Sequence, residues 1–249
     1  MKKKILLVSG CSWTTNNFKS IHHNKPFDFT KWPSILADKL NMECCNLAKS
    51  GAGNEYILNS LIEKIEMLKP ENIGLVIAAW SGGAREDYQV RAKYPNLDLW
   101  HHERWSVKGD MHYFMKRSLR QYYLFQIYCE KYNIPYKQVQ MIDLWQAGIW
   151  DDFSSEMMFK SNVDKYDAHY TFANSVLYRK INTNNFIGWP GIGLSRYVKS
   201  YNKPADRFLR NGFNFRELIH KNKLEISDID KHPNEKGHKL IAEKIYENL

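Results

Sequence analysis

The chain has 249 residues and a formal net charge of +9. Hydrophobic residues make up 43% of it and aromatic residues 14%, which is enough for a sizeable core and excludes a disordered chain. Apart from the cluster Lys2-Lys3-Lys4 the charge is scattered, so we interpret it as a solvated surface and do not expect nucleic acid to be the main partner.

The N-terminus resembles a bacterial lipoprotein signal only in part. Three lysines precede an apolar stretch that ends before Cys11, but that stretch has only four residues, Ile5–Val8. A signal needs roughly 7–15 apolar residues, so a buried first strand explains the segment better. We therefore expect no export and a cytoplasmic location.

Cysteine usage and hydropathy also favour a cytoplasmic protein that is not embedded in a membrane. The four cysteines show neither a disulfide framework nor a C-x-x-C spacing: Cys11, Cys44, Cys45 and Cys129. We expect reduced thiols. No run approaches the ~18 apolar residues of a membrane span, and we expect no membrane partner.

Strands and helices are predicted to alternate along the chain. The patterns predict strands over residues 5–8, 42–47, 74–80 and 136–142, and helices over 32–40, 55–68, 112–132 and 235–248. Asn54 is a suitable N-cap for the second helix.

Two regions interrupt this alternation. Residues 85–111 and 144–225 are expected to be irregular, aromatic-rich insertions within a single domain over residues 1–249. The order of elements predicts an α/β fold with a central parallel sheet, helices on both faces and a functional site at the carboxyl ends of the strands.

Two segments carry candidate catalytic residues. Ser12 follows the first strand in Ser9-Gly10-Cys11-Ser12, and His232 precedes the last helix in Asp230-Lys231-His232-Pro233-Asn234. A carboxylate beside an imidazole fixes its tautomer and stabilises the imidazolium that forms when a serine proton is taken up. By itself, Ser12 is better explained as a helix N-cap or turn serine, and His232 could equally be a histidine in a surface turn.

Together, the segments resemble the motifs of the SGNH (GDSL-like) hydrolases. Gly10-Cys11-Ser12 matches the family's serine motif with Cys in place of Asp, and Asn46–Gly51 matches its second motif. The segment Asp230–His238 matches the terminal motif best. The resemblance, which includes short proteins of bacteriophage genomes, spans residues 5–249.

This resemblance implies a three-layer, flavodoxin-like α/β/α fold. It also implies Ser12 as the nucleophile, His232 as the general base, and the backbone N–H groups of Ser12 and Gly51 in the oxyanion hole. The family aspartate usually stands three residues before the histidine, where this chain has Ile229. Asp228 and Asp230 flank that position, and we favour Asp230 as the acid of the triad.

The third motif departs further from the family pattern, which is Gly-x-Asn-Asp. This chain reads Trp80-Ser81-Gly82-Gly83 there, so the asparagine that acts as the third oxyanion donor is missing. Ser81 or Arg85 could replace it, since a guanidinium is a strong donor. Asn54 is a further candidate, although helix capping explains it adequately.

Other chemical signals are weaker. The histidine pairs His22-His23, His101-His102 and His232 with His238 lack a ligand spacing with Cys or carboxylates, so we expect no metal and no cofactor. We expect His238 to pack at the start of the last helix.

Aromatic side chains gather in the two insertions. They are either the packing of a covering loop or a carbohydrate-binding platform: Trp100, His101, His102, Trp105, His112, Tyr113, Trp145, Trp150 and Trp189. The sequence leaves both interpretations open.

The function expected from the sequence is that of a serine esterase. It would remove an acyl group from a carbohydrate or a small ester, with an acylated small molecule or glycan as its partner. The alternative is an inactive SGNH-like domain that binds glycans or has a structural role, including one in a virion. The oligomeric state stays open.

Overall fold

The structure is a computed structural model that describes residues 3–91, 98–103, 110–142, 144, 172–189 and 214–249. Its centre is a five-stranded parallel sheet with the order β4-β1-β5-β8-β9. The strands are β1 (Ile5–Ser9), β4 (Glu43–Asn46), β5 (Ile73–Trp80), β8 (Tyr136–Gln140) and β9 (Phe186–Ile187).

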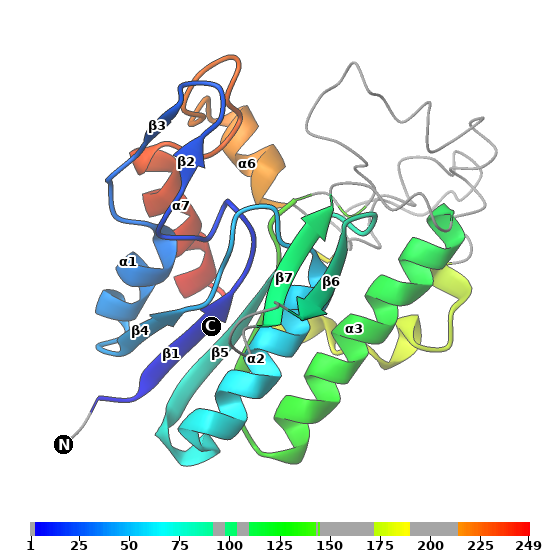
Figure 1. Cartoon of the computed structure of the whole chain (residues 1–249). Helices are drawn as coiled ribbons and strands as arrows, with labels where there is room; N and C mark the ends of the chain where they lie inside the picture. The colour runs from blue at the N-terminus through cyan, green and yellow to red at the C-terminus, as the bar shows by residue number, and fades with distance from the viewer. Residues whose placement is uncertain (1–2, 92–97, 104–109, 143, 145–171, 190–213) are drawn as a thin grey trace, which may run out of the picture.

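Helices cover both faces of this sheet (Figure 1). One face carries α1 (Trp32–Lys39) and α7 (Glu235–Tyr246), which pack on each other, and the other carries α2 (Asn54–Leu68) and α3 (Met111–Lys131). The short helix α6 (Phe215–Lys221) precedes α7, and single 3₁₀ turns form at Pro70–Asn72, Tyr178–Lys180 and Thr183–Asn185. The α/β fold with a central parallel sheet is therefore confirmed.

The middle strands are buried because helices lie against both of their faces. All five residues of β1 are buried, and so are Val76–Trp80 of β5. Such continuous apolar strands are typical of parallel sheets covered on both sides. The predicted strands and long helices agree with these elements to within a few residues at each end.

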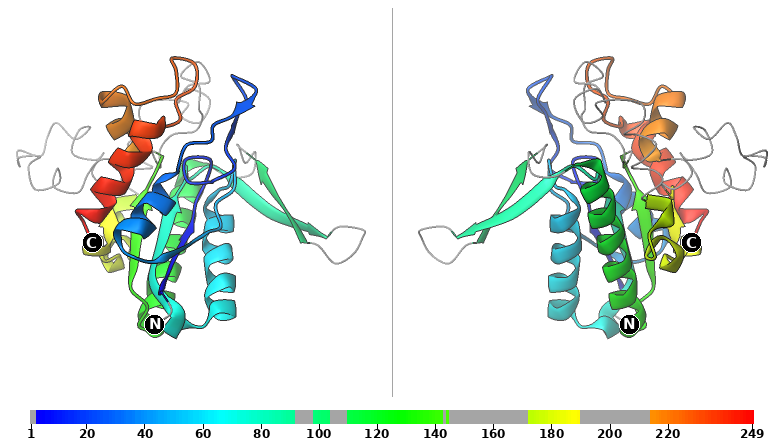
Figure 2. Two further views of the ribbon diagram at one scale, coloured as in Figure 1. Left: turned by 90° about the vertical axis from the view of Figure 1, so that its left-hand side faces the viewer. Right: turned by 90° about the vertical axis from the view of Figure 1, so that its right-hand side faces the viewer.

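Both predicted irregular regions contain regular structure that the sequence analysis missed. Within residues 85–109, β6 (Glu86–Arg91) and β7 (Asp98–Glu103) form an antiparallel hairpin that stands away from the sheet (Figure 2). Within residues 144–225 lie α6 and β9, and β9 adds the fifth strand by pairing Phe186 and Ile187 with β8. A two-residue edge strand has too short a pattern to be detected in a sequence.

A second small hairpin, also missed, follows β1. It consists of β2 (Lys19–Ser20) and β3 (Lys25–Pro26) and lies beside the segment that leads into α7 (Figure 1).

The strand order positions the functional site. It corresponds to 2-1-3-4-5 in the order in which the sheet strands occur along the chain, the order of flavodoxin-like sheets. The chain runs to opposite sides after β1 and β5, and ligands of such sheets bind at this switch point, outside the carboxyl ends of the strands. Ser12 follows β1 at that point.

Candidate active site

Ser12 lies in a tight turn directly after β1. The Cys11 carbonyl accepts hydrogen bonds from the backbone N–H groups of Thr14 at 2.9 Å and Thr15 at 3.1 Å, which closes the turn. A Cβ atom at Gly10 would come within 2.5 Å of the Thr14 hydroxyl, so only glycine fits before the turn without a shift. The Ser12 side chain is partly exposed.

His232, in the segment that precedes the last helix, contacts Ser12. Its Nε2 lies 2.8 Å from the Ser12 Oγ, and its Nδ1 lies 2.6 Å from Oδ1 of Asp230. The same Oδ1 accepts the backbone N–H of His232 at 3.1 Å. Asn234 fixes the end of this segment because it caps α7, accepting the Gly237 N–H at 2.9 Å.

Aromatic rings enclose the imidazole. The Phe18 ring lies 4.3 Å from the His232 ring and the Trp13 ring 6.0 Å, measured between centroids. Burial lowers the pKa of His232 below its usual value, although Asp230 acts in the opposite direction; the nearby charges of Arg85 and His22 lower it further. The imidazole is therefore held neutral at neutral pH, as a general base must be.

The carboxylate that contacts His232 belongs to Asp230. Asp230 is buried, whereas Asp228 is exposed. Burial alone would raise the pKa of Asp230, but hydrogen bonds from His232 and Ser20 outweigh it and hold the pKa far below its usual value. Asp230 is therefore ionised at neutral pH.

The segment after β4 runs beside the Ser12 turn. The Lys49 N–H donates to the Gly10 carbonyl at 3.0 Å, and the Asn46 side chain donates to the Thr14 carbonyl at 2.7 Å. Gly51, further along this segment, has a φ of +85°, a conformation that side chains with a Cβ rarely adopt. The segment thus carries its glycine to the same edge of the sheet as Ser12.

Asn54 does not cap α2, contrary to the sequence analysis. The N-cap is Gly53, and Asn54 is the first residue of the helix. Its Oδ1 accepts the backbone N–H of Ser81 at 2.8 Å and so ties α2 to the end of β5. The helix N-terminus is left to another residue because Asn54 is turned toward the sheet.

That other residue is Asp87 in β6, which sequence reasoning missed. Its buried carboxylate accepts the N–H groups of Gly53 and Tyr56, each at 2.8 Å, and it lies 2.7 Å from Nδ1 of His102. A carboxylate at a helix N-terminus accepts hydrogen bonds from the free N–H groups there, and its negative charge interacts favourably with the helix dipole. No local motif in the sequence pairs Asp87 with residues more than 30 positions earlier.

Ser81 and Arg85, the two candidate replacements for the missing asparagine, differ in solvent exposure. Ser81 is fully buried, and its hydroxyl has no hydrogen-bond partner among the described residues. Arg85 is partly exposed and donates from its guanidinium to the Ala52 carbonyl at 3.1 Å, between the two glycines of the Gly51–Gly53 turn. Among the described residues, no carboxylate lies within ion-pair distance of Arg85, so its charge is not neutralised by a salt bridge.

Those aromatic residues of the two insertions that the structure describes do not share one surface. Trp189 is buried against Phe186 and Phe172 and belongs to the core, which excludes it from an exposed platform. Trp100 packs edge-on against Tyr56, and His101 stacks on Tyr88. Tyr113 is exposed and His112 partly exposed on α3. Trp105, Trp145 and Trp150 lie outside the described residues.

His238 lies within α7 and is buried. Its Nδ1 accepts the Trp32 N–H at the start of α1, so it packs at the start of the last helix as the sequence predicts. The described residues hold no group of three or more His, Cys, Asp or Glu side chains arranged to bind a metal. Across the same ranges, no helix is long and apolar enough to cross a membrane.

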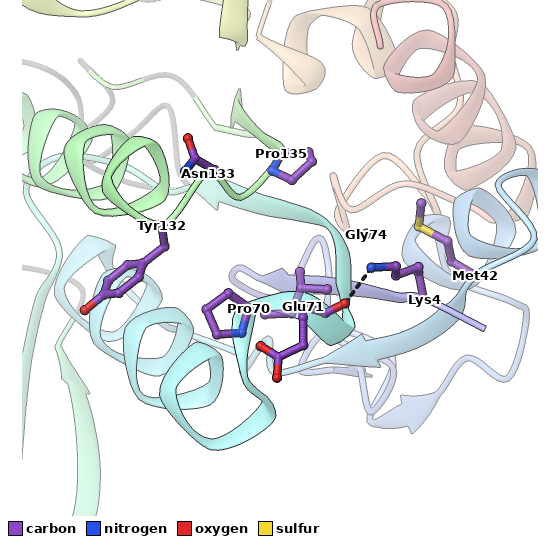
Figure 3. A pocket seen from close by; sticks show the side chains of 9 residues that line it. Lys4, Met42, Pro70, Glu71, Gly74, Tyr132, Asn133 and Pro135 are labelled. Carbon is purple, nitrogen blue, oxygen red and sulfur yellow. Dashed lines mark hydrogen bonds between the residues drawn. The ribbon is translucent and has the colours of Figure 1, made fainter. Parts of the chain in front are cut away.

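Two cavities open at the other end of the sheet. The one in Figure 3 is lined by Lys4, Met42, Glu71, Tyr132 and Pro135, among others, around the amino ends of β1 and β5. The second shares part of this lining. Neither includes Ser12 or His232, so these cavities are separate from the site described above.

No family model and no curated protein matches the sequence. Among solved structures, the psychrotrophic esterase EstA from Pseudoalteromonas sp. is similar with a TM-score of 0.51 and 12% identity, covering 98% of this chain and 96% of that one. A protein assigned to the SGNH hydrolases, from Slackia heliotrinireducens, has a TM-score of 0.47 and 13% identity over 100% and 99% of the two chains. Identities this low bear on the fold alone. From its parallel sheet, its covering helices and the likeness to the esterase, we conclude that the chain has a flavodoxin-like, three-layer α/β/α fold similar to that of the esterase.

Proposed function

We propose that this chain is a serine esterase that acts through Ser12, His232 and Asp230. The observation that carries the proposal is the continuous contact from the Ser12 Oγ to Nε2 of His232 at 2.8 Å and from its Nδ1 to Asp230 at 2.6 Å. These three residues come from opposite ends of the chain, and a serine–imidazole–carboxylate arrangement is the one that activates a serine for acyl transfer.

The geometry supports one direction of proton transfer. Asp230 accepts the Nδ1 proton of His232, which leaves Nε2 free to take the Ser12 proton while the Oγ attacks the ester carbonyl. The imidazolium then protonates the leaving alcohol, and a water molecule, deprotonated by the same Nε2, releases the acid from Ser12. Asp230 remains ionised throughout and stabilises the imidazolium.

The negatively charged oxygen of the tetrahedral intermediate must be stabilised by hydrogen-bond donors, which form the oxyanion hole. We propose the backbone N–H groups of Ser12 and Gly51 and the guanidinium of Arg85. Arg85 is supported by its contact with Ala52, by the lack of a salt-bridge partner among the residues that the structure describes, and by its effect on the pKa of His232. Ser81, the other candidate from the sequence, is disfavoured because its hydroxyl is fully buried and a substrate oxygen could not reach it without a rearrangement.

The substrate we propose is an acyl group on a carbohydrate or another small ester. The partial exposure of Ser12 and the absence of a cofactor requirement in this chemistry are compatible with it. We also propose that residues 1–249 form a single domain.

Hydrolysis of p-nitrophenyl acetate tests the proposal. We expect turnover by the wild type, and loss to the level of the blank in Ser12→Ala and in His232→Ala. Ser34→Ala and His220→Ala are the matched controls: Ser34 is a residue of α1, and His220 is an exposed residue of α6 paired with Glu225. If the wild type and Ser12→Ala hydrolyse acetyl and longer acyl esters at equal rates, the proposed esterase activity is refuted.

A covalent probe gives an independent readout. The Pseudoalteromonas esterase structure is described as inhibited by monoethylphosphonate. An activated ethylphosphonate ester should therefore react at Ser12, with the Oγ displacing the leaving group from phosphorus. The mass of the intact wild-type chain should rise by one phosphonyl group, and that of Ser12→Ala should not change.

A further inference from the structure

The β2–β3 hairpin holds a buried serine against the proposed triad. Lys19, Lys25 and Pro26 of this hairpin are exposed, but Ser20 is fully buried. Isolated two-stranded hairpins have little stability of their own, so contacts with the rest of the molecule must keep this one in place. The hairpin lies beside the segment that carries Asp230 and His232 (Figure 1).

The Ser20 hydroxyl donates to Asp230. It contacts Oδ2 of the carboxylate, while Oδ1 accepts the two N–H groups of His232. Both oxygens of the buried carboxylate are thereby engaged, Oδ1 by His232 and Oδ2 by the Ser20 hydroxyl. Because each carboxylate oxygen is held by hydrogen bonds, the side chain of Asp230 is not free to rotate.

A second contact joins the hairpin to the same segment without touching the carboxylate. His23 Nε2 lies 2.9 Å from the Ser227 hydroxyl, and that hydroxyl accepts the backbone N–H of Asp230 at 3.1 Å. The His23 backbone N–H in turn donates to the Ser20 oxygen at 3.2 Å, so the Ser20 hydroxyl is oriented to donate to Asp230.

We propose that Ser20 is a positioning residue for the reaction, orienting the Asp230 carboxylate toward Nδ1 of His232 and withdrawing part of its charge. The inference rests on the proposed function for its catalytic consequence but not for its structural one. Ser20 touches neither substrate nor reacting atoms and acts through Asp230.

The charge state of His232 provides the test, because it can be followed without a substrate. The charged or titratable groups that act on it, or on which it acts, are Asp230, Arg85, His22 and His238. Removing the Ser20 hydroxyl removes a dipole whose positive end faces the carboxylate. The carboxylate then presents more negative charge to the imidazole, so the pKa of His232 rises.

The experiment is an NMR titration of the His232 ring protons, assigned by their loss in His232→Ala. We expect Ser20→Ala to raise the pKa of His232 and to lower kcat for p-nitrophenyl acetate about tenfold, with KM within about twofold of the wild type. Ser227→Ala is the matched control, since it removes a hydroxyl from the same network but not from the carboxylate. Its His232 pKa should equal that of the wild type.

Two results would overturn the inference. One is an unchanged His232 pKa in Ser20→Ala, and the other is an equal shift in Ser227→Ala, which would indicate general loosening of the segment. If Ser20→Ala does not fold, Ser20→Cys replaces it: the thiol is nearly the same size but a far weaker donor, and the pKa should move in the same direction. If the wild type hydrolyses no ester, the proposed function fails while the titration still decides the role of Ser20.

Discussion

At the scale of single residues, Arg85 is the side chain that we propose in place of the asparagine missing from the third motif. The turn that it contacts, Gly51–Gly53, carries one of the proposed oxyanion donors, and the guanidinium donates to the Ala52 carbonyl in its middle. Two further backbone contacts hold the Arg85 region, because the Arg117 guanidinium donates to the carbonyls of Gly83 and Arg85. A charged donor held at this position can replace a neutral amide, since donors to developing negative charge are strongest when they are charged.

We therefore predict that Arg85→Met lowers kcat by roughly 10²-fold, the usual order of loss for one oxyanion donor, and changes KM much less. The measurement is steady-state hydrolysis of p-nitrophenyl acetate. Arg120→Met serves as the control, because Arg120 is an exposed residue of α3 and its substitution removes the same charge. A kcat equal to that of the wild type would assign the third donor to another group.

At the scale of elements, the N-terminus of α2 depends on the β6–β7 hairpin. Asp87 is more than 30 residues away in sequence but supplies the cap that Asn54 does not, and His102 from β7 contacts the same carboxylate. A Cβ atom at Gly53 would meet this carboxylate at 2.8 Å, which shows how closely hairpin and helix approach. The hairpin thus supports the turn that contains Gly51.

We predict that Asp87→Ala lowers the free energy of unfolding by about 1–3 kcal/mol, because it leaves two helix N–H groups without an acceptor and removes the partner of the partly buried His102 imidazole. Urea unfolding followed by circular dichroism measures this. Glu86→Ala is the matched control: it removes a carboxylate from the adjacent position of β6, which points to the opposite side of the strand. Equal unfolding midpoints for the two variants would contradict the assigned role.

At the scale of the whole molecule, His238 joins the last helix to the first. It accepts the backbone N–H of Trp32 from within α7, and the Phe29 ring lies 5.5 Å away. Burial, together with the charges of Lys31 and His232, lowers the pKa of His238 to about 3. The folded protein therefore keeps this imidazole neutral where an unfolded chain would protonate it.

The sign of the resulting pH dependence follows from linkage. The unfolded chain binds a proton at His238 below about pH 6.5 and the folded chain only near pH 3, so stability is complete above 6.5 and falls as the pH drops between these values. At pH 5 this residue should reduce the free energy of unfolding by about 2 kcal/mol relative to pH 7. His238→Gln keeps an acceptor for Trp32 but does not titrate.

Urea unfolding at pH 7 and pH 5 measures the difference. The loss of stability between the two should be smaller in His238→Gln than in the wild type by about the amount given above. His220→Gln provides the comparison, because His220 is exposed and should leave the wild-type loss intact. The same loss in all three proteins would show that His238 titrates normally in the folded state.

The sequence by itself predicted four of the five sheet strands, all but β9, and named candidate residues at their carboxyl ends. Apolar runs such as Ile5–Val8 and residues 74–80 predict buried strands because they are short, continuous and rich in Ile, Leu and Val. The motifs around Ser12 and His232 then named the candidate residues, since their spacing is local. Only the tertiary structure decided between Asp228 and Asp230, because either lies near enough in sequence and only one is turned inward.

The remaining features depend on contacts between distant parts of the chain. Ser20 meets Asp230 across 210 positions, and Asp87 meets the start of α2 across more than 30. Neither residue lies in a recognisable local pattern, and a serine or an aspartate in a polar loop is commonplace. Packing alone brings each beside the group that it serves, because a buried carboxylate or helix end must find partners wherever the fold provides them.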